Sequence, residues 1–143
     1  MRIIAHKIDI AVKQLETAID LFVDRGDYIS AITLAGAAEE ILGVLVKRSG
    51  KCPAVDELCK ALISKYVPTA DSWYIRNQYL NKARNSLKHA NHAKEDQIEI
   101  EVEPEAISMI ARSLSNLITL DRSVPYNVDK FFRAMSDKAL WER

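Results

Sequence analysis

The stretch that decides the fold reads YISAITLAGAAEEILGVLVKRS over residues 28–49. It is apolar almost all around a helical axis, which is typical of the central helix of a bundle. Glu39 and Glu40 interrupt it, and two adjacent carboxylates at mid-span would be costly in lipid, so we predict a buried helix and no association with a membrane. Gly36 and Gly43 lie one heptad apart and would let a neighbour approach closely, at about 1 kcal/mol each in helix propensity.

Glycine, aspartate and proline residues on both sides of this stretch mark where the neighbouring helices begin and end. Gly26 and Gly50 stand where glycine ends a helix, and Asp27 stands where aspartate begins one. Pro53 precedes a third helix, and either Asp71 or Ser72 caps a fourth. The predicted helices cover residues 3–25, 28–49, 54–66, 72–91, 104–121 and 127–140.

The composition agrees with an all-helical chain. The 143 residues include only four Gly and four Pro, whereas sandwiches and barrels use many more in their turns. The predicted helices cover about three-quarters of the chain, against roughly one-third on average. We therefore predict one domain over residues 1–143. Its fold class is all-α: an antiparallel up-and-down helical bundle with a four- to five-helix core, a short extended acidic arm and an extra C-terminal helix.

The formal net charge is zero, from 20 basic and 20 acidic side chains, but the charges are not evenly spread. Residues 72–94 carry no acid, and residues 95–105, the acidic arm, carry six acids and no base. Within the arm, Ile98, Ile100 and Val102 alternate with acids, which indicates an extended segment. The basic stretch could be simply a solvated face. The arm could pair with it, pair with another subunit, or cover a site until RNA displaces it.

The sequence lacks the motifs that are typical of several catalytic and metal-binding sites. There is no Gly-rich phosphate loop, no G-x-S-x-G elbow and no Glu-x-x-His pair, and His89-x-x-His92 lacks a third ligand. We therefore predict no metal and no cofactor. Cys52 and Cys59 are expected to be reduced packing residues. With no signal peptide in the N-terminal sequence, a cytoplasmic location is expected.

The remaining candidate is the segment from Arg84 to His89. Arg offers a fixed, charged fork that suits phosphate, and His exchanges a proton near neutral pH. On one continuous helix the two would lie about 140° apart around the axis, whereas Asn85 and His89 would share a face. The basic side chains nearby are candidates for RNA binding: Arg76, Lys82, Lys88 and His92.

The segment ARNSLKHAN at residues 83–91 resembles the Arg-x(4–6)-His motif of the HEPN superfamily, which consists of small all-α bundles. The segment AITLAGAAEEILGVLVKR at residues 31–48 resembles the alanine-rich, acid-containing second helix of the same domains. The likeness covers about residues 5–120. A tyrosine that follows the histidine by two residues in one toxin branch is replaced here by Asn91, so regulation through that tyrosine is not expected.

The resemblance implies a metal-independent endoribonuclease that works as a homodimer, with RNA as substrate and an antitoxin or other protein as a further partner, in a defence or toxin–antitoxin setting. It implies Arg84 and His89 as the catalytic pair, Asn85 as an orienting residue, and Glu39 or Glu40 as support for the Arg. The alternative within the family is a non-catalytic module that binds nucleotide, RNA or protein. The third interpretation lies outside this family: a helical interaction or structural protein of another kind.

Overall fold

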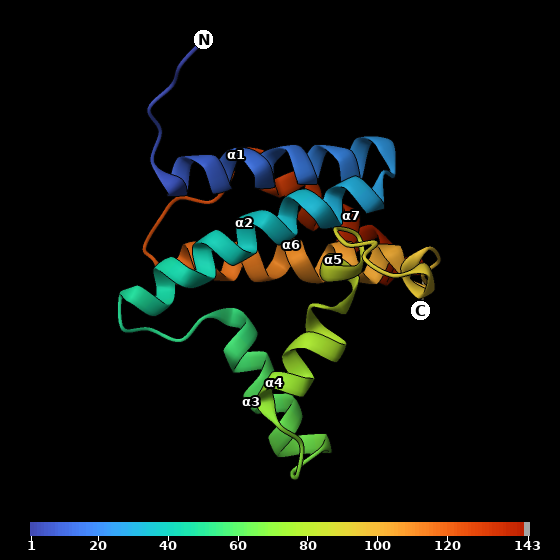
Figure 1. The fold of residues 1–143 in the computed structure, drawn as a ribbon. Helices are drawn as coiled ribbons and strands as arrows, with labels where there is room; N and C mark the ends of the chain where they lie inside the picture. Colours follow the sequence, from blue (N-terminus) through green and yellow to red (C-terminus); the bar gives the residue numbers. More distant parts are fainter. Residues whose placement is uncertain (142–143) are drawn as a thin grey trace.

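The structure is a computed structural model that describes residues 1–141, and among these it contains helices, turns and loops but no strand (Figure 1). The α-helices are α1 (Lys7–Asp20), α2 (Tyr28–Arg48), α3 (Ala54–Tyr66), α4 (Ser72–Ile75), α5 (Lys82–Ser86), α6 (Val102–Thr119) and α7 (Val128–Trp141). Two π-helical turns, η1 (Leu21–Arg25) and η2 (Arg76–Leu80), and a 3₁₀ turn, η3 (Ala93–Glu95), lie between them. The predicted all-α helical bundle is confirmed.

The core lies between α1, α2, α6 and the start of α7. Neighbours along the chain, α1 with α2 and α6 with α7, are antiparallel (Figure 1). In contrast, α2 and α6 run parallel: Tyr28 bonds Glu103 at the start of both, and Ser113 bonds the carbonyl of Ala35 further along both. This pair is parallel because residues 54–86 carry the chain away and back to the middle of α2, and residues 87–101 then lead it to the end where α2 begins (Figure 1). Fully buried side chains of the core include Leu15, Ile19, Ile32, Leu42, Met109, Ile110 and Leu117.

The glycine and aspartate signals act as predicted. Gly26 ends η1 with a left-handed φ of 62°, a conformation that glycine adopts without strain. Asp27 caps α2 by accepting the backbone N–H of Ser30 at 3.1 Å. Gly50 follows α2 with a φ of 81°. The buried central helix therefore begins and ends where local chemistry directs it.

Two other helix starts differ from their predictions. α1 begins at Lys7 rather than at residue 3, because Ile3 and Ile4 are exposed and have no core to pack against. α6 begins at Val102, two residues before the predicted start, and Pro104 lies in its first turn, where its missing N–H costs nothing. The acidic arm is consequently non-helical only from Asp96 to Glu101.

Residues 54–86 form a side hairpin that projects from the bundle (Figure 1). α3 runs outward, and α4, η2 and α5 bring the chain back. Of the two predicted caps for α4, Asp71 performs the role, since its carboxylate accepts the backbone N–H of Trp73 at 2.8 Å. This hairpin delivers the Arg-x4-His segment to the side of α2.

The prediction of one continuous helix over residues 72–91 is wrong. The helix widens into η2, breaks at Asn81, resumes as α5 and ends at Ser86, so residues 87–91 are not helical. The physical reason lies on α6: Arg112 Nη1 donates to the carbonyl of Leu80 at 2.9 Å. In a continuous helix that carbonyl would accept the N–H of Arg84.

By length and composition, α2 is the one helix in the described part of the chain that could span a membrane. About half of its most apolar window is buried inside the fold, and it carries the buried Glu39. Such a helix is equally typical of a soluble core, so the absence of a membrane partner stays a prediction.

Candidate functional site

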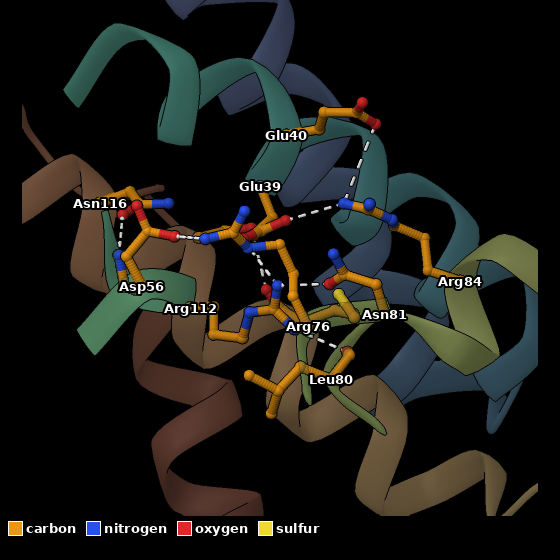
Figure 2. Close-up of polar contacts among 12 residues, drawn as sticks. Glu39, Glu40, Asp56, Arg76, Leu80, Asn81, Arg84, Arg112 and Asn116 are labelled. Carbon is orange, nitrogen blue, oxygen red and sulfur yellow. Dashed lines mark hydrogen bonds and ion pairs between the residues drawn. The ribbon is translucent and has the colours of Figure 1, made fainter. Parts of the chain in front are cut away.

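Glu39 is the centre of a buried charge network in which two arginines share one carboxylate (Figure 2). Arg84 Nη1 donates to Glu39 Oε2 at 2.9 Å, and Arg112 Nη2 donates to Glu39 Oε1 at 2.8 Å. Arg112 Nη2 also donates to Asn81 Oδ1 at 2.8 Å. Glu39 is only 2% exposed, so both of its oxygens need these donors to offset the loss of water.

Glu40 points outward and plays a different part. Its side chain is 58% exposed, and its carboxylate lies 3.9 Å from Arg84 Nη1 and 3.8 Å from Lys88 Nζ. Ion pairs this exposed contribute little to stability. The sequence did not show which of the two glutamates faces inward; in the structure it is Glu39.

Gly36 provides the space that Arg84 occupies. A Cβ atom built at Gly36 would lie 2.6 Å from both Cγ and Cδ of Arg84, which is closer than two carbons can approach. At Gly43 the nearest atoms to such a Cβ are Asn116 Nδ2 at 3.7 Å and a carbon of Pro53 at 3.8 Å, an ordinary contact. Of the two glycines predicted to allow close approach, Gly36 is the one that does so, and it admits an arginine stem.

Two further contacts fix the side hairpin to the bundle. Asn116 Oδ1 accepts the backbone N–H of Ala54 at 2.9 Å and so caps the start of α3. Arg76, on the returning arm of the hairpin, forms an ion pair with Asp56 of α3 (Figure 2). These contacts fix the two arms of the hairpin, and the Glu39 network joins α5 to α2.

A pocket of about 280 Å³ lies over this network, between α2, the start of α3 and the returning arm. Arg84, Arg76 and Asn81 line it together with both glutamates. His89 is not among the lining residues. The motif arginine therefore faces one side of α5, where it is 8% exposed and paired with a carboxylate.

His89 lies on the other side, in what we call the arm groove, the seam between α5 and the acidic arm. Three adjoining hollows of about 540, 140 and 370 Å³ form this groove, and all three share Ser86, Glu95 and Ile98 as lining residues. His89 and Asn85 line the middle hollow together. The predicted sharing of a face by Asn85 and His89 is thus retained, although His89 lies beyond the end of the helix.

The four predicted RNA-binding residues are also divided between the arm groove and other parts of the surface. Lys82 lines one end of the arm groove and Lys88 the other, and both are exposed. Arg76 lies on the opposite side, in the ion pair with Asp56. His92 is exposed at the start of η3 and lines none of the three hollows. Lysines 82 and 88 are therefore the two that share a surface with His89.

The acidic arm forms the second wall of the groove. Glu95 Oε2 accepts the backbone N–H groups of Asn91 at 2.6 Å and His92 at 3.1 Å, and so closes the turn after the motif. At the far end, burial raises the pKa of Glu105, which also lines the groove. The arm thus packs beside the motif segment of its own chain, but among the described residues none of its acids forms an ion pair with a base of residues 72–94, and Glu103 pairs instead with Lys138 of α7.

Sequence reasoning missed three residues that organise the site: Asn81, Arg112 and Asn116. Arg112 carried a signal, because a charged residue stands among apolar positions on the buried face of α6, beside Met109 and Ser113. A cation there requires a buried acid, and α2 supplies Glu39. The two amides carried no comparable signal.

The cysteines are free in the structure, with Cys52 half-buried and Cys59 buried. Burial is the main cause that raises the pKa of the Cys59 thiol. Among residues 1–141, no three His, Cys, Asp or Glu side chains gather closely enough to hold a metal ion.

Comparison with known proteins adds no relative. No family model, no curated protein and no solved structure matches the chain. The HEPN resemblance therefore rests on the motif segment around Arg84 and on the second-helix segment alone, and a function for the chain has to come from the geometry of the arm groove and of the buried network.

Proposed function

We propose that this protein is a HEPN-type, metal-independent endoribonuclease that acts as a homodimer, with His89 as the group that transfers protons. One observation carries the proposal: the motif places an exposed His89 beside Asn85 in a groove that Lys82 and Lys88 flank. A histidine can accept the proton of the attacking hydroxyl and nearby cations can stabilise the phosphoryl charge, which are two of the roles that metal-free cleavage of a phosphodiester requires.

In this reaction His89 takes the proton of a ribose 2′-hydroxyl, and the oxygen attacks the adjacent phosphorus. The bond from phosphorus to the 5′-oxygen breaks, leaving a 2′,3′-cyclic phosphate. The leaving oxygen then needs a proton. One chain presents one motif histidine, and a second copy in a homodimer supplies a second group for that step. Lys82 and Lys88 are the cations placed to stabilise charge on the phosphoryl oxygens.

Arg84 has a different role in this proposal. Its guanidinium is committed to Glu39 on the far side of α5, and its stem fills the space over Gly36. It therefore acts as a positioning residue that holds α5, and with it His89, in place. This assignment departs from the resemblance, which implies that the arginine is part of the catalytic pair.

The test is cleavage of a labelled RNA in EDTA, with analysis of the product ends. We expect His89→Ala to lower the cleavage rate about 10²- to 10⁴-fold while leaving the fold intact, because the side chain is exposed. His6→Ala is the matched control, since His6 is an exposed histidine before α1. Cleavage that persists in His89→Ala, or products without cyclic phosphate ends, would overturn the proposal.

A second candidate is a non-catalytic HEPN-like module that binds RNA. The pairing of Arg84 with Glu39 favours it, because the motif arginine is then structural. This candidate predicts RNA binding with no cleavage by any variant.

A further inference from the structure

Two non-helical segments of the chain leave their backbone groups without partners: residues 1–5, before α1, and residues 97–100 of the acidic arm. Within the part of the chain that the structure describes, no N–H or C=O group of either segment forms a backbone hydrogen bond. Backbone with free donors and acceptors is a template on which another extended segment can pair. Each segment therefore has the hydrogen-bonding groups that the other lacks a partner for.

The acidic arm presents its free backbone to an open space. Residues 97–101 line the hollow of about 540 Å³ one after another, with Ile100 packed on the core and Glu99 and Glu101 exposed. The acids that line this hollow outnumber the bases: Glu95, Glu99, Glu101 and Glu105 against Lys82 and Lys94. A segment that fills the hollow is therefore expected to be apolar and basic.

Residues 1–5, which we call the N-terminal segment, have that character. They read MRIIA and contain no acid. Ile3 is 70% exposed and Ile4 is fully exposed, so neither side chain has a place in its own fold. Isoleucine favours extended pairing, and in an extended conformation Arg2 and Ile3 point to opposite sides. Arg2 can thus lie beside the exposed acids of the arm while Ile3 lies beside Ile98.

The N-terminal segment is too far from the acidic arm of its own chain to pair with it. The arm lies where α1 ends and α2 begins, because Tyr28 of α2 bonds Glu103 of the arm. The N-terminal segment leaves from the other end of α1, a helix of 14 residues or about 21 Å, and points away from the bundle (Figure 1). Five extended residues span at most about 18 Å. Two antiparallel copies can instead exchange these segments reciprocally, which closes a dimer.

We propose that the N-terminal segment of one copy pairs as an extended strand with residues 97–101 of a second copy, and that the second copy returns the same contact. Main-chain hydrogen bonds supply the affinity, and the attraction of Arg2 to Glu99 or Glu101 supplies the choice of partner. This inference rests on the homodimer of the proposed function and adds the surface that forms it. It does not require the ribonuclease chemistry.

The first test blocks the main-chain pairing. Ile3→Pro with Ile4→Pro removes two N–H groups from the N-terminal segment, keeps it apolar and disturbs no backbone hydrogen bond within the chain. Sedimentation equilibrium at micromolar concentration should show a dimer weakened by about tenfold or more, since both exchanged contacts are lost. Ile3→Val with Ile4→Val is the matched control. It keeps both N–H groups and the preference for extended backbone, and should dimerise within about threefold of the unmodified protein.

The second test reverses the charges. Arg2→Glu alone, and Glu99→Lys with Glu101→Lys, each place like charges beside each other. Each should weaken the dimer by roughly 3- to 30-fold, because every dimer contains two such contacts. The variant that combines all three substitutions restores opposite charges and should dimerise more tightly than either parent. Damage to the fold in the separate variants would not produce that recovery.

A monomeric unmodified protein would overturn the inference, as would a proline variant that dimerises like the valine variant, or a combined variant no tighter than its parents. The proposed function fails separately. If the unmodified protein cleaves RNA and the proline variant dimerises equally well, the exchange is wrong and the ribonuclease stands. If the proline variant is monomeric but no variant cleaves RNA, the exchange stands and the ribonuclease is wrong.

Discussion

The two ends of the Arg84–His89 segment lie in opposite environments, although only four residues separate them. Arg84 is buried, its stem is packed over Gly36 and its charge is paired with Glu39. His89 is exposed in a groove with lysines on one side and carboxylates on the other. The helix ends between them, at Ser86. The buried end is suited to hold the segment in place, and the exposed end is suited to perform chemistry.

This comparison predicts that substitutions at the buried end change stability, whereas substitutions at the exposed end change RNA binding and cleavage. Substitutions at matched positions in different environments test this prediction.

The largest effect is expected at the centre of the buried network. Glu39→Ala removes the one buried carboxylate that two buried guanidiniums share, and should lower the free energy of unfolding by about 3–5 kcal/mol. Glu40→Ala, at the adjacent and exposed position, should change it by less than about 1 kcal/mol. Urea unfolding followed by circular dichroism measures both, and similar losses in the two variants would contradict the buried network.

The next largest change in stability is expected at Gly36 of α2, with Gly43 of the same helix as the comparison. Gly36→Ala drives a methyl group into the stem of Arg84, and should cost about 1–3 kcal/mol of stability. Gly43→Ala meets only ordinary contacts and gains helix propensity, so it should be neutral or stabilise the fold by up to about 1 kcal/mol. A shift of the unfolding midpoint in the same direction for both variants would show that Arg84 does not depend on Gly36.

The smallest effect concerns the acidic wall of the groove. Replacing Glu99 and Glu101 together by Gln removes two negative charges from the hollow that Lys82 and Lys94 line, and should tighten RNA binding by about threefold to tenfold at low salt. The gain should shrink as salt is added. Glu57→Gln with Asp137→Asn makes the same change in net charge at exposed positions away from the groove. An equal gain in that control would mean that the arm has no local effect.

The sequence predicts local features of this molecule well and long-range ones poorly. The bounds of α2 and α3 follow from Gly26, Asp27, Gly50 and Pro53, whose signals act within a few residues of their own position. The break in the predicted fourth helix follows from Arg112 on α6, which removes the carbonyl of Leu80 from the helix. No pattern within residues 72–91 contains that information.

The same division holds for the candidate site. The motif predicted Arg84 and His89 as candidates, the second-helix resemblance added a supporting glutamate, and helical periodicity predicted that the arginine and the histidine would not share a face. Which glutamate is buried depends on how α2 packs against α6, so the sequence left the choice between Glu39 and Glu40 open. The arm groove depends on how the chain after Ser86 turns back, which only the structure shows.

The most direct test of the division within the motif is single-turnover RNA cleavage by the folded fraction of Arg84→Lys, measured beside His89→Ala. Lysine keeps a positive charge near Glu39 but loses the planar guanidinium whose Nη1 donates to Glu39 Oε2, so Arg84→Lys should lose stability. Its folded molecules should nevertheless cleave within about tenfold of the unmodified protein, whereas His89→Ala should lose about 10²- to 10⁴-fold at unchanged stability. If folded Arg84→Lys is as inactive as His89→Ala, then Arg84 contacts the phosphate itself, and the proposed division between a holding end and a reacting end is wrong.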